Sequence, residues 1–231
     1  MPDNSLKLLE PGTLYIVATP IGDWKDITLR ALEILRNVDA VICEEARVGS
    51  TLLKKLGITP KEIIQINEHN EKEKSPELIT RFWHGQSLAL ISDCGTPLFA
   101  DPGVEVVSLA INSGIRVVPI PGPSSLTAFL SILDQKLDKF IFAGFLARDP
   151  RQRRTALSEL KTHRMPIILM DTPYRLKTLL EDLRTVFGKG QRLTLGCNLT
   201  LPNETILRAS VADIQKRIGE QKAEFILLVH R

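Results

Sequence analysis

Short apolar runs rich in valine, isoleucine and leucine alternate with amphipathic stretches along most of this chain. In the first half, the runs span residues 13–19, 40–43, 63–66, 88–92 and 115–120. Between them, apolar residues recur at helical spacing and predict helices over residues 28–38, 50–56, 76–84 and 104–113. The run at 88–92 is apolar almost throughout, as expected of a strand buried on both faces. This alternation favours a parallel sheet with right-handed crossovers, so we predict an α/β fold.

A proline-rich segment, PIPGPSS at residues 119–125, interrupts this pattern near the middle of the chain. Closely spaced prolines disfavour regular structure and stiffen a connection, so we expect a domain boundary there. The alternation then resumes, with predicted strands at 139–142, 167–170, 192–197 and 225–229 and predicted helices at 151–161, 174–187 and 211–218. We therefore predict two α/β domains, residues 1–120 and 121–231.

Composition excludes several classes of protein. The chain has 231 residues, 43% of them hydrophobic and 25% charged, which is ordinary for a globular protein. Its three cysteines, Cys43, Cys94 and Cys197, show no CxxC spacing, so we expect neither a disulfide framework nor a metal site. No apolar run approaches the roughly 20 residues that span a bilayer, and the N-terminus lacks a signal pattern. We expect a cytoplasmic protein without a membrane partner.

The segment from Ser92 to Gly103 (SDCGTPLFADPG) follows the continuous apolar run. In open α/β sheets, ligands bind at the carboxyl ends of strands. Gly95 and Gly103 permit unusual backbone conformations, and the prolines stiffen the loop, so its backbone can hold a small ligand. The alternative is a long strand-to-helix connection containing two turns. A dinucleotide site is excluded because the first strand is followed by ATPIGDW, with Gly22 as its only glycine, and no phosphate-binding GxxxxGK[ST] loop occurs.

Several motifs occur in the order found in one group of enzymes: TLYIVATPIGDWKDITLRALEIL, CEEAR, SDCGTPLFADPG, PIPGPSS, AGFLARD and MDTPYR. Over residues 12–231 the chain resembles the tetrapyrrole methylase superfamily of S-adenosylmethionine-dependent methyltransferases. It is most similar to the branch that methylates a cytidine ribose 2′-oxygen in small-subunit (16S) rRNA. The resemblance implies two α/β domains with the cofactor, S-adenosylmethionine, in the cleft between them, and a homodimer.

The resemblance also implies which residues bind the methyl donor. Carried onto this chain, they come from loops at strand ends and from the strand before DTPYR: Ile21, Asp93, Gly95, Thr96, Phe99, Ser124, Ser125, Met170, Asn198 and Glu224. Backbone carbonyls and small hydroxyls suit the methionine part and the ribose of the donor, and a methionine side chain can pack against adenine. Without the resemblance, an ordinary core role is the simpler interpretation of Met170.

A ribose hydroxyl is a poor nucleophile unless a group removes or polarises its proton, which makes a general base attractive. Glu44, Glu45 and Asp93 follow neighbouring predicted strands, and Arg47 could orient a carboxylate or bind a phosphate. We predict Glu45 and Arg47 as catalytic residues. The alternative is that they form a structural ion pair. His69 is a weaker candidate.

Residues 148–164 form a local basic segment, which we predict to contact RNA phosphates. It carries Arg148, Arg151, Arg153, Arg154, Lys161 and Arg164 against Asp149 and Glu159, and Arg175 and Lys177 could extend it. The alternative is the solvated face of a helix.

Some segments depart from the rRNA branch. CEEAR stands where that branch usually has EDTR, and NLTLPNET (198–205) stands where it has a lysine- and glutamate-containing stretch. The typical member also continues into a small helical domain, whereas this sequence ends at Arg231. Two alternatives therefore stay open: a related methylase acting on a tetrapyrrole or another RNA, and a non-catalytic protein that binds the cofactor or RNA.

Overall fold

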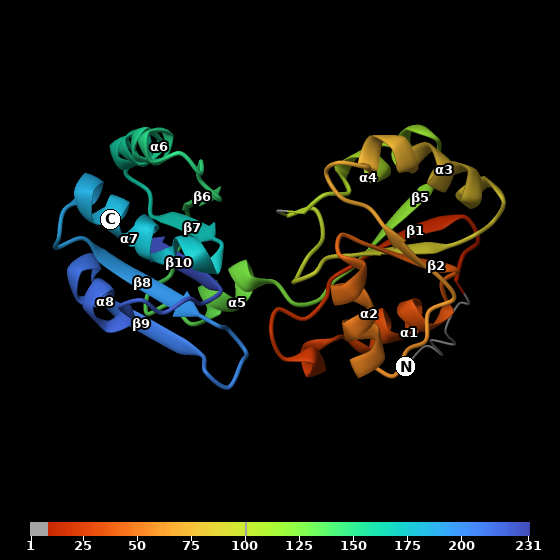
Figure 1. Ribbon diagram of the computed structural model, residues 1–231, viewed down its shortest axis with the longest axis horizontal. Helices are drawn as coiled ribbons and strands as arrows, with labels where there is room; N and C mark the ends of the chain where they lie inside the picture. The colour runs from red at the N-terminus through yellow and green to blue at the C-terminus, as the bar shows by residue number, and fades with distance from the viewer. Residues whose placement is uncertain (1–8, 100) are drawn as a thin grey trace. The chain divides into compact units, whose positions relative to one another are not determined.

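The computed structural model describes residues 9–99 and 101–231 of the chain. They divide into two compact units, the first ending at Ser124 and the second beginning at Ser125. Each unit contains one five-stranded sheet with helices packed on it (Figure 1). The predicted α/β class is confirmed.

The sheet of the first unit is parallel throughout. Its strands have the spatial order β3-β2-β4-β1-β5. Their bounds are Thr13–Val17 (β1), Ala40–Cys43 (β2), Ile63–Gln65 (β3), Leu88–Ile91 (β4) and Arg116–Ile120 (β5). All residues of β2 and β4 are buried, because both faces of these central strands are covered by helices. Every strand ends at the same edge of the sheet, which gathers the loops that follow them.

Helices cover both faces of this sheet. Their bounds are Leu29–Asn37 (α1), Ala46–Lys55 (α2), Glu71–Trp83 (α3) and Val104–Asn112 (α4), with a short 3₁₀ turn, η1, at Trp24–Asp26. Helices α1 and α2 share a core with Val17 and Ile91, whereas α3 and α4 pack with Leu14 and Leu90 on the opposite face. Thr28 caps α1 by accepting a hydrogen bond from the backbone N–H of Ala31 at 3.1 Å.

Two predicted helix boundaries are wrong. Helix α2 begins at Ala46 rather than residue 50, and α3 begins at Glu71 rather than residue 76. The predicted start fell on Pro76, a residue type that is common in the first turn of a helix. In the structure Pro76 lies inside α3, where the buried Ser75 hydroxyl donates to the Glu71 carbonyl at 2.5 Å. Tertiary packing of the apolar face of α3 outweighs the local preference.

The sheet of the second unit is mixed, with the order β6-β7-β10-β8-β9. Only β6 and β7 are parallel, and the other neighbouring pairs are antiparallel. The strands span Ile141–Gly144 (β6), Ile167–Asp171 (β7), Arg192–Cys197 (β8), Thr205–Ser210 (β9) and Phe225–Val229 (β10). The carboxyl ends of β6, β7 and β8 and the start of β10 therefore meet at one edge of this sheet.

Helices also cover both faces of the second sheet. They span Ser125–Ser131 (α5), Pro150–Thr162 (α6), Leu176–Phe187 (α7) and Val211–Ile218 (α8), with a 3₁₀ turn, η2, at Pro173–Arg175. Helices α6, α7 and α8 pack on one face through Leu157, Leu183 and Ile214, and α5 packs on the other through Phe129. The sequence did not predict α5 or β9. Helix α5 directly follows the prolines, and β9 is an edge strand with no fully buried residue to mark it.

No helix in the described part of the chain is long and apolar enough to cross a membrane.

Candidate functional site

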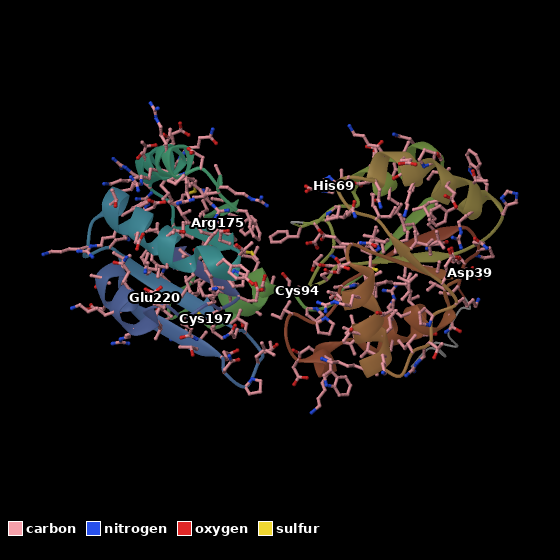
Figure 2. The ribbon with its side chains drawn as sticks, viewed as in Figure 1. Asp39, His69, Cys94, Arg175, Cys197 and Glu220 are labelled. Carbon is pink, nitrogen blue, oxygen red and sulfur yellow. The ribbon has the colours of Figure 1, made fainter. Side chains whose placement is uncertain are left out.

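Strands β1 and β4 lie side by side, yet the helices that follow them pack on opposite faces of the sheet. Helix α1 follows β1 on one face, and α4 follows β4 on the other. In open parallel sheets, a reversal of this kind marks the carboxyl edge at which such folds bind ligands. The predicted loop from Ser92 to Gly103 begins at this point, and Figure 2 labels its exposed Cys94.

Hydrogen bonds join this loop to the loops after β1 and β5. The Thr19 backbone N–H donates to the Gly95 carbonyl at 2.9 Å, and the buried Thr19 hydroxyl donates to the Ser92 carbonyl at 2.9 Å. On the other side, the Thr96 hydroxyl donates to the Pro123 carbonyl at 3.3 Å. These contacts connect segments far apart in the sequence. They bring the predicted residues Gly95 and Thr96 beside the segments that carry Ile21 and Ser124.

The loop is also closed on itself and against α3. The buried Ser92 hydroxyl donates to Asp101 Oδ2 at 2.5 Å and accepts from the Cys94 N–H at 3.0 Å. Glu71 Oε1 accepts the backbone N–H groups of Gly103 at 3.0 Å and Glu105 at 2.6 Å. A carboxylate at a helix N-terminus satisfies otherwise unpaired donors, so Glu71 fixes the start of α4. Sequence analysis assigned no role to Glu71 or Asp101, although Asp101 lies within the motif SDCGTPLFADPG.

Glycine is required at two positions in this loop. Gly95 has φ +88°, and a Cβ there would lie 3.2 Å from Ile21 Cγ2. Gly103 has φ +121°, and a Cβ there would lie 2.9 Å from Leu98 Cδ2. Leu98 itself has φ +67°, a conformation that costs energy for a residue with a side chain. The backbone of the loop is therefore held close to its neighbours in a conformation that few sequences adopt.

Carboxylates gather beside the loop. The Glu45 backbone N–H hydrogen-bonds to Asp93, and the second oxygen of Asp93, Oδ1, is buried with no partner among the described residues. Burial raises the pKa of Asp93, and the nearby Asp101 and Glu45 raise it further. Burial and the neighbouring Asp93 likewise raise the pKa of Glu44. An unpaired buried oxygen costs about 1–3 kcal/mol, so such a group marks a site whose purpose is not stability alone.

The predicted catalytic pair lies at the start of α2. Glu45 is the residue before the helix and is exposed, as is Arg47. Across the described residues, no ion pair joins their side chains, so nothing in the structure supports the alternative of a structural pair. Glu44, Glu45 and Asp93 lie near one another, because they follow the neighbouring strands β2 and β4.

The remaining predicted donor residues belong to the second unit. Ser125 Oγ lies 3.9 Å from the sulfur of Met170, which is in β7 and half-buried. The backbone N–H of Asn198 donates to the Glu224 carbonyl at 2.8 Å, and Asn198 has φ +52°. Asn198 follows β8 and Glu224 precedes β10, so the two lie at the edge where β7 also ends. Partial burial raises the pKa of Glu224.

Phe99, a predicted donor residue of the first unit, is 43% exposed.

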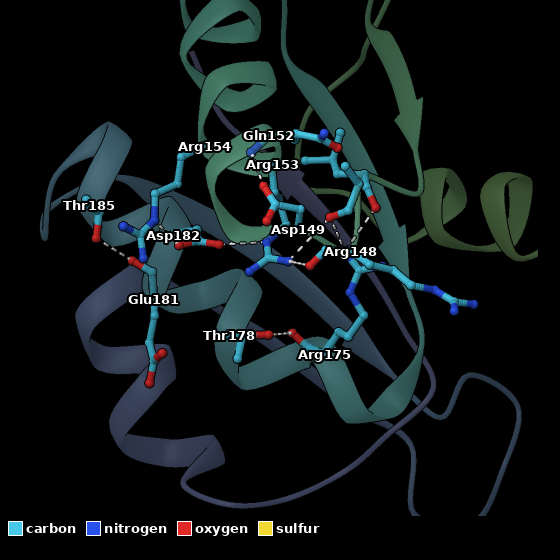
Figure 3. Close-up of polar contacts among 12 residues, drawn as sticks. Arg148, Asp149, Gln152, Arg153, Arg154, Arg175, Thr178, Glu181, Asp182 and Thr185 are labelled. Atoms are coloured by element: carbon cyan, nitrogen blue, oxygen red, sulfur yellow. Dashed lines mark hydrogen bonds and ion pairs between the residues drawn. The ribbon is translucent and has the colours of Figure 1, made fainter.

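The structure separates the cations of the basic segment into two groups. Arg153 is 4% exposed, and it donates to Asp182 Oδ2 at 2.6 Å and to the Arg148 carbonyl at 2.9 Å. Arg154 binds the other oxygen of Asp182 at 2.6 Å, so that Asp182 lies between the two arginines (Figure 3). Lys161 donates to the Val186 carbonyl at 2.7 Å.

The side chain of Arg175 is likewise bound to partners within the second unit. Its guanidinium pairs with Asp171 at 3.1 Å and donates to two backbone carbonyls. In contrast, the exposed guanidinium groups of Arg148, Arg151 and Arg164 have no side-chain partner in the part of the chain that the structure describes.

Comparison with known proteins identifies the protein family to which the chain belongs. The model of the tetrapyrrole (corrin/porphyrin) methylases matches residues 13–215. A cobalt precorrin-4 methyltransferase of cobalamin biosynthesis has the same fold, with a TM-score of 0.69, 19% identity and coverage of 95% of both chains. Uroporphyrin-III-C-methyltransferase from Thermus thermophilus gives a TM-score of 0.64 at 21% identity, over 95% of this chain and 94% of that one. The chain therefore belongs to the tetrapyrrole methylase family and is an S-adenosylmethionine-dependent methyltransferase.

Within this family, the chain is similar in sequence to curated ribosomal RNA methyltransferases. The chain is 44% identical over 225 residues to ribosomal RNA small subunit methyltransferase I of Mesorhizobium japonicum, covering 96% of this chain and 76% of the relative. It is 40% identical over 223 residues to the protein of that name from Xylella fastidiosa, strain Temecula1, covering 95% and 81%. The predicted resemblance is confirmed over nearly the whole sequence.

Proposed function

We propose that this methyltransferase transfers a methyl group to the ribose 2′-oxygen of a cytidine in small-subunit ribosomal RNA. The observation that carries this proposal is the similarity, over about 95% of the chain, to relatives named for methylating that RNA. The fold alone does not choose between substrates, because structures with tetrapyrrole substrates share it at 19–21% identity. The family match over residues 13–215 includes both segments that depart from the rRNA branch, CEEAR and NLTLPNET.

The residues present suit S-adenosylmethionine. The residues that would hold it, as the family resemblance implies, are Ile21, Asp93, Gly95, Thr96, Phe99, Ser124, Ser125, Met170, Asn198 and Glu224. Asp93 Oδ1, which lacks a protein partner, is suited to accept from a hydroxyl or ammonium group of the donor. The fixed backbone around Gly95 offers carbonyl groups without a large entropic cost on binding. When bound, the donor supplies an electrophilic methyl group on a sulfonium.

Methyl transfer to a hydroxyl requires an in-line approach and loss of the hydroxyl proton. We assign proton removal to Glu45, whose exposed carboxylate lies beside Asp93 at the open edge of the sheet. Arg47, two residues further along α2, is free to bind the phosphate next to the reacting ribose. Burial and the neighbouring carboxylates raise the pKa values of Asp93 and Glu44, so negative charge is concentrated beside Glu45 at this edge of the sheet.

The exposed cations of residues 148–164 contact the RNA backbone. Arg148, Arg151 and Arg164 are available for this role, whereas Arg153 is committed to Asp182 inside the second unit. The proposal also includes a cytoplasmic location, where ribosomal subunits are assembled, and a homodimer, as the family resemblance implies.

Methyl transfer from labelled S-adenosylmethionine to purified small ribosomal subunits that lack the modification tests the proposal. We expect label in the RNA at a single cytidine, and strongly reduced incorporation with Glu45→Gln. A uroporphyrinogen-type tetrapyrrole serves as the competing substrate. Label in the tetrapyrrole and none in the RNA contradicts the proposal, and donor binding with no transfer to any substrate indicates a non-catalytic protein.

A further inference from the structure

Two large aromatic residues at one edge of the second sheet face solvent. Tyr174, in the turn η2 after β7, is 75% exposed, and Phe145, directly after β6, is 48% exposed. Neither belongs to a hydrophobic core cluster of its unit. Leaving aromatic surface in water forfeits the stabilisation that burial provides, so a pair of such side chains on neighbouring strand ends points to a ligand.

The segments that carry these rings are fixed to each other. Arg175, the residue after Tyr174, donates from Nη2 to the Leu146 carbonyl at 2.9 Å and to the Ala147 carbonyl at 2.7 Å. Its Nη1 pairs with the buried Asp171 at 3.1 Å. Figure 3 shows Arg175 at the start of α7, close to the segment around Arg148. Since Arg175 is mostly buried, the two loops present their aromatic residues from a rigid support.

Positive charge accompanies the rings. Lys222 Nζ lies 4.6 Å from the centre of the Tyr174 ring, within the range of a cation–π contact. Arg148, three residues after Phe145, is exposed, and no side chain in the described part of the chain pairs with it. Exposed aromatic rings accompanied by exposed cations match single-stranded nucleic acid, whose bases stack while its phosphates are neutralised.

This surface lies at the edge where the second unit carries its predicted donor residues. Phe225, at the start of β10, is paired with Asp171 of β7 and Cys197 of β8. Met170 precedes Asp171, Asn198 follows Cys197, and Glu224 precedes Phe225. Tyr174 is therefore close in the chain to Met170, and Lys222 is close to Glu224. An acceptor held on the rings would be brought to the same edge as the donor.

We propose that Tyr174 and Phe145 form a stacking platform for unpaired bases of the RNA substrate, with Lys222 and Arg148 binding the adjoining phosphates. This inference rests on the proposed function, and it identifies the acceptor-binding part of the same site. Stacking is sequence-tolerant, because every base has an aromatic face, so the platform orders the strand rather than choosing the cytidine. It requires that the target lie in an unpaired segment or be unstacked on binding.

The test compares binding of a fluorescently labelled single-stranded RNA of about ten nucleotides to wild type, Tyr174→Ala, Phe145→Ala and Tyr174→Phe. We expect the alanine variants to bind RNA roughly 5- to 150-fold more weakly, as loss of one stacked base does, and Tyr174→Phe to bind nearly as wild type. Trp83→Ala is the matched control, because Trp83 is 66% exposed but lies on α3 of the first unit. Donor affinity, measured by calorimetric titration, should be unchanged in all variants.

Steady-state methylation separates this inference from the proposed function. If small subunits are the substrate, Tyr174→Ala raises KM for the subunit more than it lowers kcat. Wild-type kinetics in both alanine variants overturn the platform and leave the rRNA assignment intact. If wild type binds RNA through these residues yet methylates no ribosomal subunit, the rRNA assignment fails and the platform stands. Binding of a tetrapyrrole that depends on Tyr174, without RNA binding, overturns both.

Discussion

The buried pair between Arg153 and Asp182 supports a sharp prediction about stability. Their side chains are 5% and 2% exposed, and Arg153 Nε lies 2.6 Å from Asp182 Oδ2. Asp182→Asn keeps the volume of the side chain but leaves the guanidinium of Arg153 without a counter-charge. Breaking a buried ion pair by removing one partner costs about 3–5 kcal/mol, a large part of the roughly 5–15 kcal/mol of a whole domain.

Urea denaturation followed by circular dichroism measures this cost. With a slope of about 2 kcal/mol per molar urea, a loss of about 4 kcal/mol lowers the midpoint of the second unit by about 2 M. Both tryptophans of the chain, Trp24 and Trp83, lie in the first unit, so their fluorescence reports on that unit separately. We expect Asp182→Asn to lower the circular dichroism transition much more than the fluorescence transition.

Two further variants control for the interpretation. Arg154→Ala removes the exposed arginine on the other oxygen of Asp182 and should hardly change the midpoint, because water screens that pair. Replacing the buried pair by Arg153→Met with Asp182→Leu should recover much of the loss, since apolar substitutes often equal a buried ion pair. A midpoint for Asp182→Asn within about 0.3 M of wild type would refute the reasoning, because it corresponds to less than about 1 kcal/mol.

Three other predictions concern the first unit and the basic segment. Gly95→Ala places a side chain on a residue whose φ is +88°, which should cost about 1–3 kcal/mol of stability. The variant should also bind S-adenosylmethionine more weakly in a calorimetric titration. An unchanged affinity would contradict the role of this loop. Burial raises the pKa of Asp101 above that of the unfolded chain, so its ionisation destabilises the fold as pH rises from about 4 towards neutrality. Asp101→Asn should therefore gain stability relative to wild type between pH 4 and 7, and a constant difference across that range would argue against it. Arg151→Glu should weaken RNA binding and reduce its salt dependence by at least the roughly 0.7 logarithmic units expected per phosphate contact, and an unaltered salt slope would exclude Arg151 from the interface.

Much of the fold could be predicted from the sequence, because its strands are short runs of branched aliphatic residues that tertiary packing then buries. The runs at 40–43 and 88–92 coincide with β2 and β4, whose residues are all buried. Prediction failed where local signals were weak or misleading. Strand β9 is half-exposed along its length, and Pro76 lies within a helix whose apolar face, including Leu78 and Phe82, holds it against the sheet.

The position of the candidate donor loop could be predicted from the sequence, but its shape could not. The glycines, prolines and motif order of residues 92–103 pointed to a ligand site after β4. The loop owes its conformation to partners distant in the chain, such as Thr19 and Glu71, whose hydrogen bonds to it span 73 and 32 residues. A pattern of residues does not reveal such pairings, because each depends on where the strands and helices bring its two ends.

The sequence by itself determined the α/β class and the family, and it pointed to a candidate donor site, since these follow from hydrophobic periodicity and from motifs carried within short segments. Only the tertiary structure decided which charges of the basic segment are exposed. The sequence does not distinguish Arg151 from Arg153, because both lie in the same basic segment. In the structure Arg151 is exposed, whereas Arg153 is buried against Asp182. The physical reason is the cost of burying charge: a buried arginine requires a partner, and α7 supplies it 29 residues away.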